Sequence, residues 1–194
     1  MLQAAFIILG YLLGSISFGI LMSKAFGLPD PRTVGSGNIG ATNIARSGKR
    51  LPAILTLFGD AGKGWLVVFF SQHYGISDAY ICAVALAVFL GHCYPIFYGF
   101  TGGKGVATAA GILFAFSVWM GLIVIAVWLI VFAVTRISSL SALIASVVSP
   151  FAGWYLLTYN GYGTTALILA VLLIWRHKSN IQKLLAGTET GFKK

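Results

Sequence analysis

The segment VATAAGILFAFSVWMGLIVIAVWLIVFAV, from Val106 to Val134, decides the fold because it is long, apolar and free of charged residues. As one α-helix it would extend roughly 44 Å at about 1.5 Å per residue, whereas the hydrocarbon core of a bilayer is about 30 Å thick. It is therefore too long for one upright transmembrane helix and short for two. One span here gives six in the whole chain, and two spans give seven.

The positions of Lys and Arg choose between six and seven, because these residues collect in the cytoplasmic loops of membrane proteins. Further apolar stretches lie at 2–23, 51–71, 79–97, 140–157 and 163–175. With six spans, Arg136 and the C-terminal cations would lie across the membrane from Lys104. A break within 116–121 instead places every Lys and Arg on one side, except Lys63 within a span. We therefore predict an all-α, polytopic membrane protein with seven transmembrane helices, the N-terminus outside and a cytoplasmic C-terminus.

The composition agrees with a chain surrounded by lipid. Hydrophobic residues make up 58% of the 194 residues and charged residues 9%, whereas soluble domains have about 25% charged residues. No linker or low-complexity tract divides the chain, so we expect residues 1–194 to form a single integral-membrane domain. The net charge of +9 is typical of positive-inside topology and of attraction to anionic membrane lipid. Because the cations lie in short loops between spans, we expect no nucleic-acid partner.

A glycine-rich loop between the first two predicted spans is the first candidate site. Gly35, Gly37 and Gly40 let the backbone turn its N–H groups inward, and consecutive N–H groups form a nest that binds anions. Neutral donors and one cation accompany these glycines: Ser36, Asn38, Thr42, Asn43 and Arg46. A helical pattern resumes near Ala41, so a helix N-terminus is also expected to point at the anion. The alternative is a flexible loop whose Gly, Ser and Asn residues only make turns.

A second glycine-rich segment follows the third predicted span, which Pro95 ends or kinks. Gly102, Gly103 and Gly105 surround Lys104, so its ammonium group can lie beside exposed backbone N–H groups, an arrangement that suits a phosphate. The segment is not a nucleotide-binding P-loop, because Gly105 stands where Ser or Thr should follow the lysine and no strand precedes it. The alternative for Lys104 is a charge that only sets the topology.

Two further groups of polar residues have structural and functional explanations. Arg176 and Asn180 are four residues apart after the last span, where one helical face would present both, and His177 lies between them. Stop-transfer charges beside a solvated histidine are the alternative. Asp60 and Lys63 are three residues apart inside the second span, where each charge is costly. A structural ion pair is the simplest explanation, and a role in the site is the alternative.

The chain has only four acidic residues, and this limits the chemistry. No pair of carboxylates lies beside the glycine-rich segments, and the sequence has no His-x4-Asp, no Gly-x-Ser-x-Gly and no zinc-type cluster. We therefore expect no metal and no cofactor. A reaction here has to use a substrate that is already activated or that carries its own base.

Together these segments resemble the acyl-phosphate:glycerol-3-phosphate acyltransferase family. The matching residues are 35–43, 91–95, 101–108, 176–177 and 180–181, and 60–64 also fit. The resemblance spans nearly the whole chain and implies a bacterial inner-membrane enzyme with seven spans and an active site facing the cytoplasm. It implies transfer of an acyl group from a fatty acyl phosphate to the 1-hydroxyl of glycerol 3-phosphate, giving lysophosphatidic acid and inorganic phosphate.

The resemblance also implies roles for individual residues. The loop 35–43 would hold one phosphate, and the glycerol phosphate would be held by Arg46, Lys104, His177 and Asn180. Ser36 and Asn180 would orient the reactants while a substrate phosphate oxygen takes the proton of the attacking hydroxyl. His177 as general base is the second mechanism, and a covalent acyl group on Ser36 is the third. A small organic-phosphate transporter and a lipid-binding protein without turnover are the alternative functions.

Overall fold

The computed structural model describes residues 1–192, which form helices joined by turns and loops and contain no β-strand. The all-α architecture predicted from the sequence is confirmed for these residues. The chain divides into two compact units, Met1–Ile112 and Leu113–Lys194. The boundary between the two units falls within the apolar helix α6 (Val106–Phe116).

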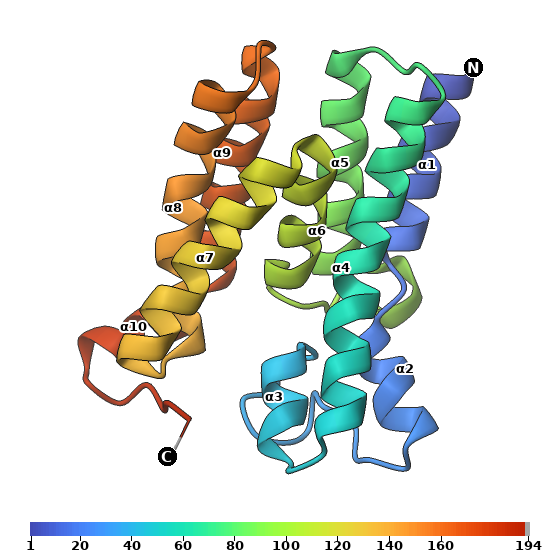
Figure 1. Ribbon diagram of the computed structural model, residues 1–194. Coiled ribbons are helices and arrows are strands. Elements are labelled where there is room, and N and C mark those ends of the chain that lie inside the picture. The colour runs from blue at the N-terminus through green and yellow to red at the C-terminus, as the bar shows by residue number, and fades with distance from the viewer. Residues whose placement is uncertain (193–194) are drawn as a thin grey trace. The chain divides into compact units, whose positions relative to one another are not determined.

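The first unit is built around its longest helix, α4 (Arg50–His73). In Figure 1, α1 (Leu2–Gly14) and α5 (Asp78–Cys93) lie alongside α4, and the contacts between α1 and α5 are extensive. The short helices α2 (Phe18–Ala25) and α3 (Ala41–Arg46) pack against α4 near its Arg50 end. The long loop between α2 and α3 carries the first glycine-rich motif, so the helices at both ends of that loop pack against α4.

Close backbone contacts through glycine hold the helices of the first unit together. A Cβ on Gly14 would overlap the carbonyl oxygen of Val88, which joins α1 to α5. A Cβ on Gly64 would overlap the carbonyl oxygen of Thr108, which joins α4 to the start of α6. Small residues at such crossings are typical of helix packing in membranes, where van der Waals contact replaces the hydrophobic effect as the driving force.

The predicted span 2–23 is not one continuous helix. Three residues, 15–17, separate α1 from α2, and the two helices are bent by 42°. Ser15 Oγ donates back to Tyr11 O at 2.9 Å, and Ser17 Oγ accepts from the Ile20 N–H at 3.3 Å as the N-cap of α2. The sequence did not reveal this break, because two serines in an apolar run are too brief an interruption to indicate a loop.

The second unit contains α7 (Val118–Thr135), α8 (Ser138–Leu156) and α9 (Asn160–Arg176), with α8 packed against both neighbours. The short helix α10 (Lys178–Leu185) follows α9. Ser117 has extended backbone and separates α6 from α7, so the break predicted within 116–121 is confirmed. Two apolar helices, and not one, therefore account for the long charge-free segment.

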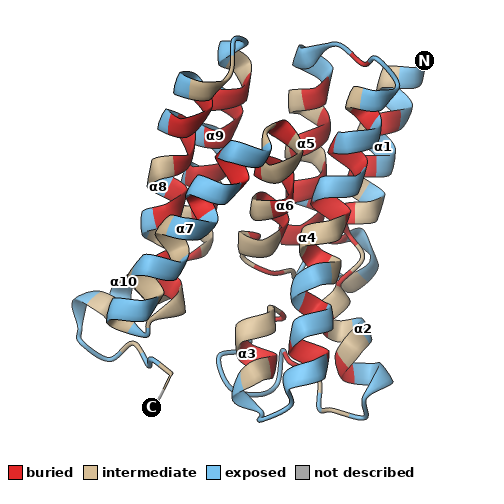
Figure 2. Ribbon diagram, in the orientation of Figure 1, coloured by how far each residue is buried: buried red, intermediate tan, exposed pale blue. Residues whose placement is uncertain are grey.

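The described helices are those of an integral membrane protein. Four segments are long and apolar enough to cross a membrane: Arg50–His73, Val118–Thr135, Ser138–Leu156, and Asp78–Tyr98, which joins α5 to the short 3-10 helix η1 (Ile96–Tyr98). The bent pair of α1 and α2 would make a fifth span, and α6 is a shorter apolar helix. Figure 2 shows exposed residues along α7, and these include Trp119, Leu129, Ile130 and Val134. A surface with so many large apolar side chains requires lipid around it.

Candidate functional site

One buried side chain, Asn43, holds the glycine-rich loop before α3 in shape. Its Oδ1 accepts a hydrogen bond from the Ser36 N–H at 2.9 Å. Its Nδ2 donates to Pro31 O at 2.9 Å and to Val34 O at 3.1 Å. Gly35 has a φ of 59°, and a Cβ there would overlap Asn43 Oδ1, so this position requires glycine. The amide of Asn43 therefore organises the loop from inside, although the sequence suggested a donor to substrate.

The outer side of this loop carries the groups that solvent can reach. Ser36 and Gly37 are exposed, and so is Arg46 at the end of α3. Half-buried residues complete the predicted set: Asn38, Gly40 and Thr42. The N–H groups of Ser36 and Gly37 are both bonded within the loop, the latter to Val34 O at 3.0 Å. These two donors of the predicted nest are therefore used by the loop itself, and the Ser36 hydroxyl is the exposed polar group at its tip.

The loop is fixed on both sides by contacts with helices. Ile39 is 2% exposed, and its carbonyl oxygen lies so close to Gly19 of α2 that a Cβ there would overlap it. The helix α3 begins at Ala41, where the sequence predicted a helix start, and packs against α4. At the beginning of the loop, Arg32 is bonded to Asp30 through its side chain, and these hydrogen bonds lower the pKa of Asp30. Both flanks of the motif thus have a defined geometry.

The second glycine-rich segment, 102–105, packs tightly against the end of α5. That helix ends at Cys93 and not near 97, because Pro95 lacks the N–H that a further turn would need. The Gly103 N–H donates to His92 O at 3.1 Å, and a Cβ on Gly103 would overlap the His92 ring at Nε2. A Cβ on Gly102 would overlap His92 O. These two glycines are required for close contact, which the sequence did not indicate.

Gly105 is the glycine of this segment that uses the conformational freedom predicted from the sequence. Its φ is 83°, and it lies against the ring of Phe89 in α5. The side chain of Lys104 stands between Gly103 and Gly105 and is half-buried. Lys104 therefore lies in the turn that packs against the end of α5 and leads into α6 at Val106. A lysine ammonium group at such a position suits an anionic ligand, because a charge-assisted hydrogen bond to a phosphate is strong.

A buried ion pair lies in the middle of α4. Lys63 Nζ is 3.0 Å from Asp60 Oδ1, and the two side chains are 1% and 3% exposed, which confirms the ion pair predicted from their spacing. The same Asp60 oxygen is 3.6 Å from His92 Nδ1. His92 had no predicted role. A role for His92 could have been suspected from the sequence, because it lies one turn before Pro95, near the end of a predicted span and shortly before the Lys104 segment.

His177 and Asn180 belong to the second unit, whereas Ser36, Arg46 and Lys104 belong to the first. His177 is 2% exposed, so it is not the solvated histidine that a stop-transfer segment would have. Its Nδ1 lies 2.8 Å from Leu173 O. Because a carbonyl oxygen only accepts, Nδ1 carries a hydrogen in this contact, so in a neutral ring Nε2 would be the nitrogen that can accept a proton. This tautomer is compatible with general-base chemistry.

Asn180 is positioned by the C-terminal segment. Its Nδ2 donates to Glu189 Oε1 at 2.7 Å, and the same oxygen accepts from Ser139 Oγ of α8 at 2.6 Å. The predicted helical face with Arg176 and Asn180 on one helix is wrong, because α9 ends at Arg176 and α10 begins at Lys178. Glu189 is a second residue whose role the sequence did not reveal, since the hydrogen bonds link positions far apart in the chain.

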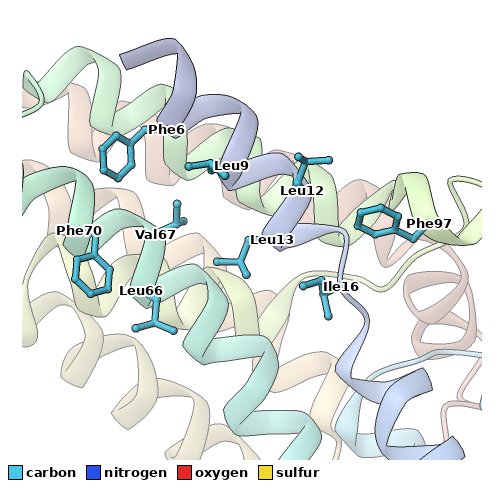
Figure 3. A pocket seen from close by; sticks show the side chains of 9 residues that line it. All are labelled: Phe6, Leu9, Leu12, Leu13, Ile16, Leu66, Val67, Phe70 and Phe97. Carbon is cyan, nitrogen blue, oxygen red and sulfur yellow. The ribbon is translucent and has the colours of Figure 1, made fainter. Parts of the chain in front are cut away.

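An apolar groove of about 470 Å³ runs between α1 and α4 in the first unit. Figure 3 shows its lining, with Ile16 and Phe97 at one end and Phe6 and Phe70 at the other. The remaining side chains of the groove are Leu9, Leu12, Leu13, Leu66 and Val67. The end at Ile16 lies at the α1–α2 break, where the Ile16 carbonyl accepts a hydrogen bond from Lys63. One end of this apolar groove therefore lies at the residue whose carbonyl is bonded to the buried Lys63.

Comparison with known proteins identifies the family. A family model described as glycerol-3-phosphate acyltransferase matches residues 4–187. The chain is 60% identical to the glycerol-3-phosphate acyltransferase of Methylobacillus flagellatus over 99% of its length and 98% of that protein. It is 49% identical to that of Thiobacillus denitrificans over 97% of its length and 96% of that protein.

Solved structures give the same result. The integral membrane glycerol 3-phosphate acyltransferase PlsY, in its glycerol 3-phosphate form, is 38% identical with a TM-score of 0.95. Its lysophosphatidic acid form is 36% identical with a TM-score of 0.93, and both alignments cover 100% of this chain and 96% of PlsY. This chain therefore belongs to the glycerol-3-phosphate acyltransferase family.

Proposed function

We propose that this protein transfers a fatty acyl group from acyl phosphate to the 1-hydroxyl of glycerol 3-phosphate, giving lysophosphatidic acid and inorganic phosphate. The observation that carries the proposal is the match, over the full chain, to an enzyme solved in its glycerol 3-phosphate and lysophosphatidic acid forms. The two PlsY structures are thus named for the substrate and for the product of a single acylation, and this chain shares their fold. The donor is inferred separately, from the chemistry of the candidate site.

The site is rich in cations and glycines and poor in carboxylates, which favours an activated donor. In acyl phosphate the acyl group is already part of a mixed anhydride, and phosphate is a good leaving group. The hydroxyl oxygen of glycerol 3-phosphate forms a bond to the acyl carbon while the bond from that carbon to the bridging oxygen breaks. The protein then has to position two anions and stabilise the developing oxyanion. Lys104 and Arg46 supply positive charge for this, and Ser36 supplies a hydroxyl donor.

The proton of the attacking hydroxyl has two candidate acceptors. We favour a phosphate oxygen of a substrate, since no carboxylate of the first unit lies in either glycine-rich segment. His177 is the second acceptor, and its Nδ1 contact with Leu173 O makes Nε2 the nitrogen that would take the proton. A covalent intermediate on Ser36 is the third route. No residue of the loop is arranged as a base toward that hydroxyl, since Asn43 bonds the Ser36 N–H and not the side chain.

The acyl chain of the donor fits the apolar groove between α1 and α4. The volume of about 470 Å³ is comparable to that of a long-chain fatty acyl group, and every lining residue is aliphatic or aromatic. The groove begins at Ile16 and Phe97, close in the chain to the break and to the Lys104 segment. A chain lying there would place its phosphate at the Ile16 and Phe97 end and its methyl end toward Phe6 and Phe70.

We further propose seven spans in a bacterial inner membrane, with the N-terminus outside and the site facing the cytoplasm. The cations Arg46, Lys49 and Arg50 surround one end of α4, while the connection from its other end to α5, residues 74–77, carries no Lys or Arg. This asymmetry supports the orientation. A single functional domain made of both units completes the proposal.

The activity is tested with the purified protein in detergent micelles. Radiolabelled glycerol 3-phosphate and a long-chain acyl phosphate are mixed with the protein, and labelled lysophosphatidic acid is quantified. Product formed without a sealed vesicle supports the proposal and excludes a pure transporter. Movement of glycerol 3-phosphate into proteoliposomes, with no lysophosphatidic acid formed, would overturn it.

A further inference from the structure

We propose that the buried cluster of Asp60, Lys63 and His92 is a positioning device that sets the Lys104 segment relative to the Ser36 loop. An ion pair three residues apart on one helix needs no further partners. Here both charged residues reach beyond α4, Lys63 toward the α1–α2 break and Asp60 toward α5. The inference rests on the acyl-transfer function proposed above, because it concerns how two phosphate-binding segments are kept in register.

Lys63 fixes the α1–α2 break. Its Nζ donates to Gly14 O at 2.8 Å and to Ile16 O at 2.7 Å, and it lies 3.0 Å from Asp60 Oδ1. Lys63 thus donates two hydrogen bonds to backbone carbonyls, and the Asp60 carboxylate lies beside it as the partner of an ion pair. The last carbonyls of a helix have no partner within that helix and attract cations. Lys63 therefore acts as a cap for the C-terminal end of α1 and allows the chain to change direction inside the protein.

Asp60 and His92 carry the connection to the Lys104 segment. Asp60 Oδ1 lies 3.0 Å from Lys63 Nζ and 3.6 Å from His92 Nδ1, and all three side chains are buried. His92 in turn touches Gly103 twice, through its carbonyl oxygen and through its ring at Nε2. A shift of the His92 ring would therefore move Gly103, and with it Lys104, which is the next residue in the chain.

The α1–α2 break also determines where the Ser36 loop lies. The helix α2 begins directly after the break, and its Gly19 is in close contact with the carbonyl oxygen of Ile39 in that loop. A second link joins the break to the end of α5, because the Ile96 N–H donates to Ser15 Oγ at 3.3 Å. The two glycine-rich segments are thus both attached to one buried network within the first unit.

This arrangement predicts an effect on catalysis that a purely structural ion pair would not have. The test is the double variant Asp60→Asn/Lys63→Met, which removes both charges together and leaves no uncompensated one in the interior. Replacing a buried ion pair by neutral residues often leaves folding intact. We expect the variant to remain folded in detergent, with a lowered thermal midpoint because Gly14 O and Ile16 O lose their donor, while kcat/KM for glycerol 3-phosphate falls at least about 100-fold. A folded double variant with kcat/KM within about threefold of wild type would overturn the proposal.

His92→Gln provides a second test that does not depend on the ion pair. We expect a folded protein whose Kd for glycerol 3-phosphate, measured by calorimetry, increases at least about tenfold. In a Lys104→Gln background the same change should have little further effect, because His92 acts through Lys104. An unchanged Kd for His92→Gln, or effects that add in the double variant, would contradict the positioning role.

Two controls distinguish a failure of the proposed reaction from a failure of the positioning role. Asp78→Asn removes an exposed carboxylate at the start of α5, and we expect wild-type kcat/KM. The wild-type protein, assayed with acyl phosphate and glycerol 3-phosphate, shows whether the proposed reaction occurs at all. Absence of product with wild type would refute the function, whereas active wild type together with active Asp60→Asn/Lys63→Met would refute only the positioning role.

Discussion

Replacing Asn43 by alanine should loosen the Ser36 loop without removing a substrate contact. The substitution deletes three hydrogen bonds to loop backbone groups, those of Pro31, Val34 and Ser36. Each such bond contributes about 0.5–1.5 kcal/mol net, and two of the three are partly solvated, so we expect a loss of about 2–3 kcal/mol in local stability. This corresponds to a roughly 30- to 150-fold larger population of open loop.

Hydrogen–deuterium exchange of the detergent-solubilised protein measures this population directly. Peptides that cover 31–43 should exchange faster by that factor in Asn43→Ala, while peptides from α4 should not change. Asn38→Ala is the matched control, because the Asn38 amide makes none of these three bonds, and its loop exchange should stay close to wild type. Unchanged loop exchange in Asn43→Ala together with a raised KM for acyl phosphate would refute the reasoning and restore Asn43 as a direct ligand.

Three further changes test other parts of the account. Lys104→Ala should lower kcat/KM more than about 100-fold with the thermal midpoint unchanged, since a fixed cation beside developing negative charge is lost, and retained activity would remove Lys104 from the site. Glu189→Ala should lower the unfolding free energy by about 2 kcal/mol, because Ser139 and Asn180 lose a common acceptor, and an unaltered thermal midpoint would contradict this. Leu13→Trp should fill the groove and reduce kcat/KM for a sixteen-carbon donor at least about tenfold more than for an eight-carbon donor. Equal losses for both donors would place the acyl chain elsewhere.

The parts of the fold that follow from local composition and charge were predictable. The break between α6 and α7 was found because Lys and Arg had to lie on one side of the membrane, and the start of α3 followed from the pattern after Gly40. The ion pair in α4 was predictable because residues three apart on a helix are neighbours. Each of these inferences uses only the type, the charge and the spacing of residues along the sequence.

The parts that depend on contacts between distant residues were not predictable. Lys63 bonds carbonyl groups of the α1–α2 break, and no local pattern connects position 63 with position 16. Gly103 is a glycine because the His92 ring lies against it, which the sequence could not distinguish from a need for flexibility. The hydrogen bonds from Asn180 and Ser139 to Glu189 depend on the path of the C-terminal segment. The candidate site could therefore be located by motif, whereas the function of each side chain within it required the structure.

The most direct test of the central claim, that a carboxylate-poor site works by positioning an already activated donor, is a comparison of donors. The purified protein is given glycerol 3-phosphate and the same acyl chain as acyl phosphate or as acyl-CoA, and kcat/KM is measured for each. We predict rapid formation of lysophosphatidic acid and inorganic phosphate from acyl phosphate and no turnover with acyl-CoA. Equal or faster turnover with acyl-CoA would contradict the account.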